Sequence, residues 1–225
     1  MKRLLEVCCG DLPSVMAAAE AGADRIELCS ALSADGVTPS AGLTTMARRL
    51  FSNRIHLLVR ANDGDFCYTD REKELMLHDV ASAASFGVEG VVVGSLDSRG
   101  RVDEEFVAKV MDIARREGLG VTFHRAFDRI ADRSEALETL ISLGVDRVLT
   151  SGGAPSAAEG YDSLHDLVSQ ADGRIVILAG GGVNRLNACS IIERTGCTEI
   201  HGSCREKGAT HSSVNEIKAI INAIS

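Results

Sequence analysis

Two cysteines, Cys8 and Cys29, stand where a pair of thiols could share a metal ion. Each lies near the C-terminal end of a short apolar run. If the runs are neighbouring parallel strands in matching register, the two residues come about 4.8 Å apart. Thiolates are soft ligands that favour Cu(I) or Zn²⁺ over hard cations. However, the chain has no C-x-x-C pair, and isolated buried cysteines often serve as small apolar side chains. Both a thiophilic metal site and a packing role are therefore consistent with the sequence.

A second group of residues has the types needed to bind an anion and move a proton. It consists of Glu27, Arg60, Asp65, His124, Arg125 and Asp128. Arginine binds carboxylates and phosphates, while histidine or a carboxylate can act as a general acid or base. These six residues are the predicted catalytic residues if the protein is an enzyme. Asp65 and Asp128 could instead cap helices or form salt bridges with Arg60 and Arg125.

Two glycine-rich segments indicate a third kind of site. They are Thr150-Ser151-Gly152-Gly153 and Ala179-Gly180-Gly181-Gly182-Val183-Asn184. Glycine exposes backbone N–H groups near the start of a following helix, which is how many barrels hold a phosphate. The predicted anion-binding residues are Ser151, Gly152, Gly180, Gly181 and Gly182. The same glycines could also be present only because the turns are tight.

Eight short runs rich in valine, isoleucine and leucine would position these side chains. They span residues 4–8, 25–29, 55–60, 90–94, 120–124, 146–150, 174–179 and 199–203. The segments between them have helical periodicity. In residues 70–86, for example, the predicted apolar face comprises Leu75, Leu77, Val80 and Ala84. Most of the helical segments end in glycine, which stops a helix and turns the chain.

Strict alternation of strand and helix predicts an α/β fold with parallel strands and right-handed crossovers. Eight such units in 225 residues fit a closed (β/α)₈ TIM barrel, because closure leaves no edge strand. An open Rossmann-like sheet is disfavoured because Cys8-Cys9-Gly10-Asp11 replaces the G-x-G-x-x-G turn after the first strand. With three prolines and no linker-like stretch, residues 1–225 are expected to form one domain.

The predicted strands place polar and apolar side chains on opposite faces. Successive strand residues alternate in direction, so the apolar set should face the helices and the polar set the barrel interior. The polar set is Glu6, Cys8, Arg25, Glu27, Cys29, His56, Arg60, Thr122, His124, Glu199, His201 and Ser203. So many ionisable groups are costly inside a barrel unless they pair or bind a ligand. A self-satisfied ion network and a ligand site both fit this pattern.

Composition and charge argue against several classes of function. A net charge of −8 disfavours binding to nucleic acid, and the apolar runs are too short to cross a membrane. Glu6 interrupts the first apolar run before a signal-peptide core is complete. Seven cysteines without framework spacing predict reduced thiols and a cytoplasmic location. The sequence does not decide between a monomer and a homo-oligomer.

Several of these segments resemble the CutC copper-homeostasis family. The most specific are Gly22-Ala23-Asp24-Arg25-Ile26-Glu27-Leu28-Cys29 and Thr122-Phe123-His124-Arg125-Ala126-Phe127-Asp128. Shorter matches are Leu5–Cys8, Gly64–Phe66, Arg147–Gly152 and Gly180–Gly182, in the same order along the chain. The resemblance implies a barrel, a cytosolic role in copper binding or tolerance, and Cu(I) ligation by Cys8 and Cys29.

Two segments depart from the pattern of that family. Arg60-Ala61-Asn62-Asp63-Gly64-Asp65-Phe66 stands where the family usually has Arg-Pro-Arg-Gly-Gly-Asp-Phe, so a second arginine is missing. After the eighth strand, Ser203–Gly208 leads almost directly to a helix predicted at residues 213–224. We expect a weaker anion site at the first segment and the loss of a lid or subunit contact at the second.

Two hypotheses about function follow. In the first, the protein binds Cu(I) through Cys8 and Cys29 in the cytoplasm. In the second, it is an enzyme that acts on a small metabolite bearing a phosphate or carboxylate, since bare copper needs neither arginines nor carboxylates. A purely structural barrel is disfavoured because burying unused charges is costly.

Overall fold

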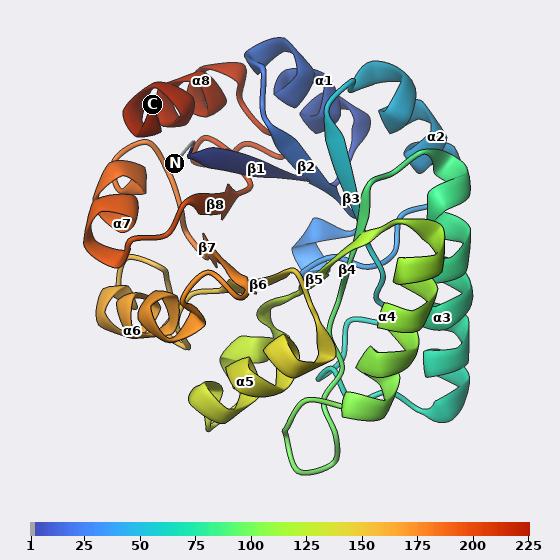
Figure 1. The fold of residues 1–225 in the computed structure, drawn as a ribbon. Coiled ribbons are helices and arrows are strands. Elements are labelled where there is room, and N and C mark those ends of the chain that lie inside the picture. Colours follow the sequence, from blue (N-terminus) through green and yellow to red (C-terminus); the bar gives the residue numbers. More distant parts are fainter. Residues whose placement is uncertain (1–2) are drawn as a thin grey trace.

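Alternating strands and helices close into a ring of eight parallel strands surrounded by helices (Figure 1). The structure, a computed structural model, describes residues 3–225. The strands are β1 (Leu4–Cys9), β2 (Arg25–Leu28), β3 (Arg54–Leu58), β4 (Gly90–Val93), β5 (Gly120–Phe123), β6 (Arg147–Thr150), β7 (Val176–Gly180) and β8 (Glu199–Gly202). Strand order follows the sequence, and β8 pairs with β1. The predicted TIM barrel is confirmed, and every predicted strand overlaps an observed one.

The helices lie outside the strand ring, as Figure 1 shows. The α-helices are α1 (Leu12–Ala21), α2 (Ala41–Leu50), α3 (Asp70–Ala83), α4 (Glu104–Glu117), α5 (Arg133–Leu143), α6 (Tyr161–Ala171), α7 (Ala188–Thr195) and α8 (Val214–Ile224). Short 3₁₀ helices are η1 (Leu32–Ala34), η2 (Ala84–Phe86) and η3 (Arg125–Arg129). Within residues 3–225, no helix combines the length and the apolar content that crossing a membrane requires.

Local sequence signals determine where the helices begin and end. The Asp11 side chain accepts a hydrogen bond from the Ser14 N–H at the start of α1, and Gly22 ends that helix with a φ of 76°. Thr69 and Glu72 form a capping box at the start of α3. Because each helix stops at a defined residue, the following strand enters the barrel in a fixed register.

The buried face of α3 differs from the prediction. Leu75 is 52% exposed, whereas Met76, Val80 and Ala83 are buried. The buried three are spaced four and three residues apart, which is the helical repeat. Leu75 and Leu77 are two residues apart and therefore point about 200° apart around a helix, so one buried stripe cannot contain both.

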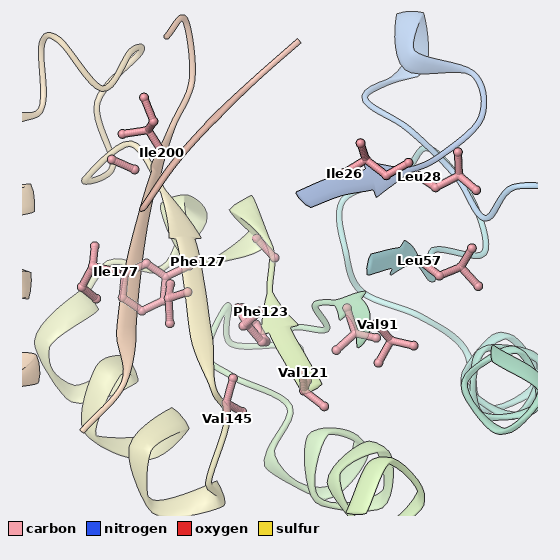
Figure 2. Packing of buried hydrophobic residues seen from close by; sticks show 14 of the residues in the cluster. Ile26, Leu28, Leu57, Val91, Val121, Phe123, Phe127, Val145, Ile177 and Ile200 are labelled. Atoms are coloured by element: carbon pink, nitrogen blue, oxygen red, sulfur yellow. The ribbon is translucent and has the colours of Figure 1, made fainter. Parts of the chain in front are cut away.

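The main apolar core lies between the strand ring and the helices (Figure 2). Ile26, Val121 and Ile200 all belong to this core and point away from the barrel interior. The apolar face of the strands therefore packs against the helices, as predicted. A separate small cluster lies inside the barrel. It consists of Cys8, Cys29, Leu58 and Val92, so the interior is only partly polar.

Candidate metal and ligand site

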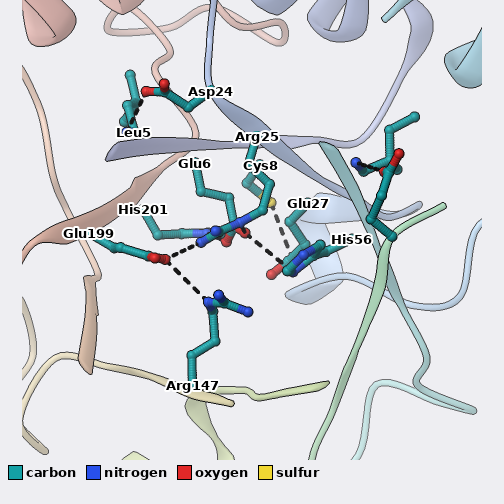
Figure 3. Close-up of polar contacts among 12 residues, drawn as sticks. Leu5, Glu6, Cys8, Asp24, Arg25, Glu27, His56, Arg147, Glu199 and His201 are labelled. Carbon is teal, nitrogen blue, oxygen red and sulfur yellow. Dashed lines mark hydrogen bonds and ion pairs between the residues drawn. The ribbon is translucent and has the colours of Figure 1, made fainter. Parts of the chain in front are cut away.

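An ion network fills part of the barrel interior. Arg25 donates from Nε to Glu6 and from Nη2 to Glu199, the latter at 2.5 Å, and Arg147 Nε donates to Glu199 at 3.2 Å (Figure 3). Glu6 and Arg25 are fully buried. Burial alone would raise the pKa of Glu6, but Arg25 and His201 hold that pKa well below its ordinary value. Arg25 and Arg147 therefore pair with Glu6 and Glu199, as expected for an ion network, although Arg25 Nη1 has no partner among the described residues.

Two histidines flank this network in opposite states. His201 Nδ1 lies 2.7 Å from Glu6 Oε1, and although burial opposes it, the contact with Glu6 raises the pKa of His201. His56 Nδ1 lies 3.9 Å from Glu6 Oε2, and burial lowers the pKa of His56 to about 3. Glu6 therefore favours the charged form of His201, whereas burial favours the neutral form of His56.

A cavity of about 320 Å³ opens where the C-terminal ends of the strands meet their following loops. Its lining residues are Cys8, Glu27, Leu32, Asp35, Leu58, Arg60, Phe66, His124, Arg125, Asp128, Arg129, Leu149, Gly181, Gly182, His201, Gly202 and Ser203. A volume of this size is in the range of sites for small organic ligands. Most of the predicted catalytic residues lie in this lining; Asp65 is the exception.

Three polar atoms of buried lining residues have no partner among residues 3–225. They are Glu27 Oε2, Arg60 Nε and His124 Nε2. Buried polar groups are normally hydrogen-bonded, so an unpartnered acceptor and two unpartnered donors in the wall of a cavity indicate places for a ligand's polar groups. Burial raises the pKa of Glu27 by more than the nearby His201 lowers it. Glu27 is therefore the carboxyl group of this cavity best suited to hold and release a proton.

His124 is held as a neutral hydrogen-bond donor. Its Nδ1 accepts the Ala126 N–H at 3.1 Å, so the ring proton is on Nε2. Burial, together with the nearby Arg60 cation, lowers the pKa of His124 to about 3. At neutral pH His124 can polarise a ligand oxygen, but it is too weakly basic to serve as the general base that the sequence analysis allowed.

Arg60 is fixed by backbone carbonyls and an aromatic ring. Its Nη1 donates to Gly36 O at 2.8 Å and to Ala34 O at 3.1 Å, and its Nη2 donates to Gly64 O at 3.0 Å. The guanidinium lies 4.8 Å from the centre of the Phe66 ring, which in turn lies 4.9 Å from the centre of the His124 ring. This stack brings a positive charge and an N–H donor to one side of the cavity.

Asp128 organises another part of the cavity wall. Its carboxylate accepts from Arg125 Nε at 2.8 Å, from Ser151 N and Oγ, from Gly153 N at 3.0 Å and from Thr150 Oγ1. The expected salt bridge with Arg125 is therefore present. Because these contacts use the acceptor capacity of Asp128, its role in the cavity is to orient Arg125 and the loop after β6.

This arrangement contradicts the predicted anion site at Ser151 and Gly152. The Ser151 N–H is bonded to Asp128 and the Gly152 N–H to Thr150 Oγ1 at 2.9 Å, so neither is available to a ligand. Gly180 does not line the cavity either. A Cβ atom at Gly180 would lie 2.5 Å from Leu149 Cδ1, so a larger residue there would displace the Leu149 side chain.

Gly181 and Gly182 fit the prediction better. Both line the cavity, and both have positive φ angles, 99° and 73°. In residues 3–225 neither N–H has a protein acceptor. The Arg125 guanidinium carbon would lie 3.3 Å from a Cβ at Gly181, so this cation and the free N–H groups share one part of the cavity. An anionic group is the ligand they suit.

Asp65 lies outside the cavity, contrary to prediction. It is exposed, and its Oδ1 accepts the Cys67 N–H at 3.1 Å. The alternative salt bridge with Arg60 is also absent from the described residues, since the hydrogen bonds of Arg60 go to backbone carbonyls. Asp65 therefore stabilises a local turn in the loop after β3.

Cys8 and Cys29 lie together, although not in the predicted register. Cys8 pairs with Glu27 across β1 and β2, and Cys29 follows two residues later, yet the two Sγ atoms are 3.9 Å apart. Cys8 lines the cavity, while Cys29 is fully buried. Hydrogen bonding to Cys29, together with burial and nearby Glu27, raises the pKa of Cys8 well above its usual value. Both residues are free thiols.

Nine lining residues were not among the predicted site residues, and His201 and Arg129 are two of them that can take part in chemistry. His201 had been assigned to the interior by strand parity, and its place near the C-terminal end of the last strand was the signal that it belonged to the mouth. Arg129 is the last residue of η3, the short 3₁₀ helix that begins at Arg125, and its place in the loop after β5 was the signal that could have found it.

Comparisons with known proteins give a consistent result. The sequence model of the CutC family matches residues 3–206. A CutC family protein of Vibrio campbellii is 44% identical over 94% of this chain and 85% of its own length. A human protein described as a copper homeostasis protein cutC homolog is 45% identical over 90% of this chain and 73% of its own.

Solved structures agree with the sequence comparisons. The crystal structure of a CutC protein from Streptococcus agalactiae has a TM-score of 0.84 and 30% identity, covering 89% of this chain and 98% of that one. Thiamine phosphate pyrophosphorylase from Pyrococcus furiosus has a TM-score of 0.66 at 17% identity, covering 99% and 95%, and this likeness concerns the fold alone.

Proposed function

The chain belongs to the CutC family of copper homeostasis proteins, and on that premise we propose that it binds Cu(I) through Cys8 and Cys29 at the mouth of the barrel. The observation that carries this proposal is the 3.9 Å separation of the two Sγ atoms. Both thiols are free, and one of them lines the cavity from which an ion would enter. Soft thiolate ligands in a site shielded from water suit Cu(I).

The chemistry of the surroundings supports the same proposal. With their protons in place the two thiols are neutral, so the buried pair has no uncompensated charge before an ion arrives. A bound ion would displace those protons, because thiolates are the ligating species. Free thiols and Cu(I) both persist in a reducing compartment, and we therefore place the protein in the cytoplasm.

An anaerobic titration tests this function. We expect the wild-type protein to take Cu(I) from a chromophoric chelator, and Cys8→Ser and Cys29→Ser each to fail in that competition. Cys189→Ser is the matched control, because Cys189 lies on α7 away from the cavity and should leave binding unchanged. Equal Cu(I) uptake by all three variants would show that copper binds elsewhere or only adventitiously.

A second function is favoured by a separate observation. The cavity is much larger than one ion, and its lining combines unpartnered buried donors on Arg60 and His124 with Arg125 and the free N–H groups of Gly181 and Gly182. These groups suit a small metabolite with a phosphate or carboxylate, held by charge-assisted hydrogen bonds. We propose that the protein acts as an enzyme on a ligand of this class.

Binding of inorganic phosphate, followed by ³¹P NMR, is the first test of the second function. The phosphate resonance should broaden and shift when wild-type protein is added, and it should change much less when the Arg125→Gln variant is added. Arg115→Gln controls for the loss of one positive charge, since Arg115 is exposed on α4 outside the cavity. If the two variants bind phosphate equally well, the cavity does not hold the anion.

A further inference from the structure

Three side chains from adjacent strands converge beside the cavity. A thiol from β1, a carboxylate oxygen from β2 and an imidazole nitrogen from β8 all lie within 4.8 Å of one another in Cys8, Glu27 and His201 (Figure 3). Ligand atoms around a tetrahedral zinc ion, with bonds of about 2.0–2.3 Å, are about 3.3–3.8 Å apart. Small side-chain rotations would therefore bring the three donors to bonding distance of one ion.

Each donor has a free position for a metal. Glu27 Oε2 is buried and has no partner among the described residues. His201 faces Glu6 through Nδ1 at 2.7 Å, which leaves Nε2 as its ligating atom. Cys8 Sγ makes only long contacts, 3.7 Å to Glu27 Oε1 and 3.9 Å to Cys29 Sγ. No strong hydrogen bond between protein groups would be lost at Glu27 or Cys8 when an ion binds.

The contact between Glu6 and His201 is itself typical of a metal site. Ligating histidines usually donate their second ring N–H to a carboxylate, which fixes the orientation of the ring and the nitrogen that faces the metal. Glu6 is in turn held by Arg25. This arrangement positions His201 before any ion is present.

We propose that Cys8, Glu27 and His201 form a site for a borderline divalent cation, of which Zn²⁺ is the best match, with a fourth coordination position open to the cavity. One sulfur, one nitrogen and one oxygen donor suit zinc better than Mg²⁺ or Ca²⁺, which prefer oxygen ligands alone. A thiolate and a carboxylate also balance the two positive charges of the ion in this buried setting. Three protein ligands with one open position is the pattern of catalytic rather than structural zinc.

This site differs from the Cu(I) pair in its ligands and in its exposure. All three residues line the cavity, whereas Cys29 does not. The two sites share only Cys8, so occupation of one excludes the other. The divalent site does not depend on Cu(I) binding, and it extends the second proposed function by giving the cavity a Lewis acid next to its anion-binding groups.

Cobalt(II) is a suitable probe, because Co²⁺ replaces Zn²⁺ and reports thiolate ligation and tetrahedral geometry in its absorption spectrum. Wild-type protein should bind one equivalent of Co²⁺ with a thiolate-to-metal charge-transfer band and intense visible bands, and Zn²⁺ should abolish both. Cys29→Ser should keep this spectrum while losing Cu(I). Glu27→Gln and His201→Gln should bind Co²⁺ more than about tenfold more weakly while keeping Cu(I).

Two further measurements make the result decisive. Circular dichroism and thermal melts identify any variant that fails to fold, and His78→Gln, on the exposed face of α3, controls for surface histidines. Wild-type protein without a thiolate–cobalt band, or an unchanged Co²⁺ affinity in folded Glu27→Gln and His201→Gln, overturns the proposal. If Cys29→Ser loses both metals, the ligand set is wrong. A wild-type protein that binds Co²⁺ as expected but does not bind Cu(I) would contradict the copper proposal and leave the divalent site standing.

Discussion

His56 and His124 are buried bases that the fold keeps neutral. Neither ring has a carboxylate at hydrogen-bond distance, and burial lowers the pKa of each to about 3. His201, near the end of β8, differs because Glu6 Oε1 lies 2.7 Å from its Nδ1. Glu6 therefore shifts the pKa of His201 in the opposite direction from the pKa values of His56 and His124.

The neutral pair predicts a loss of stability in mild acid. Between pH 6.5 and about 3, His56 and His124 bind a proton in the unfolded chain but not in the folded protein. Each should therefore lower the free energy of unfolding by about 1.4 kcal/mol for every pH unit below 6.5. His201 adds nothing in this window, because its raised pKa keeps it protonated in both states; its contribution is instead lost as pH rises through that pKa.

Urea unfolding at pH 6.0 and pH 5.0 checks this prediction. The wild type should lose stability over that interval, and His124→Gln should lose less, by about 1.4 kcal/mol per pH unit. His165→Gln, on the surface helix α6, should behave like the wild type. Identical pH dependence in all three proteins would mean that His124 is protonated in the folded state.

At the level of elements, β4 makes room for the histidines of its neighbours. A Cβ atom at Gly90 would lie 2.7 Å from His56 Cδ2, and one at Gly94, just after the strand, would overlap the ring of His124. Both glycines occupy interior positions at which a side chain would compete for the same space. The absence of side chains at Gly90 and Gly94 therefore helps to determine where the rings of His56 and His124 lie.

We predict that Gly94→Ala destabilises the protein by about 1–3 kcal/mol, the usual cost of overpacking, and displaces His124. Thermal or urea unfolding measures the first effect, and phosphate binding measures the second. The penalty should be smaller in a His124→Ala background, because the clashing ring is gone. Gly42→Ala is the control, since a Cβ there meets only Ser40 Oγ at 3.9 Å on the helix α2. Equal penalties with and without the His124 ring would contradict this account.

The elements themselves could be predicted because their signals are local. Two-residue alternation separated Ile26 from Glu27, and helix-ending glycines marked where each strand begins. The stagger between strands is not local, which is why the pairing of Cys8 with Glu27 instead of Cys29 was missed. The salt bridge of Asp128 with Arg125 was expected, but its contacts with the loop after β6 were missed for the same reason: nothing in its own segment shows that the N–H groups of Ser151 and Gly153 reach it.

At the scale of the whole molecule, the interior combines two regions that the sequence could not separate. One is the ion network around Arg25, and the other is the cavity with its unpartnered atoms on Glu27 and His124. Strand parity assigns residues to the interior, but it does not show which of them pair. Pairing depends on how far along the barrel axis each side chain lies, and the stagger between strands sets that position. The network closes off part of the interior, so a ligand entering the mouth meets Glu27 and His201 and not Arg25.

This division gives different energetic roles to the buried and exposed ion pairs. Arg25 is fully buried between Glu6 and Glu199, so Arg25→Met would leave two carboxylates facing each other without their shared partner. We predict a loss of about 3–5 kcal/mol in the free energy of unfolding, measured by urea denaturation at pH 7. Arg174→Met is the matched control, because the pair of Arg174 with Glu138 is nearly half exposed on each side and its loss should change the stability little. The difference between the two variants should shrink as the pH falls below 4.5, since protonation of Glu6 relieves the repulsion that the missing arginine leaves behind. If both variants lose the same stability at pH 7, the network is not what holds the interior closed, and the apolar contacts around the strands must do so without it.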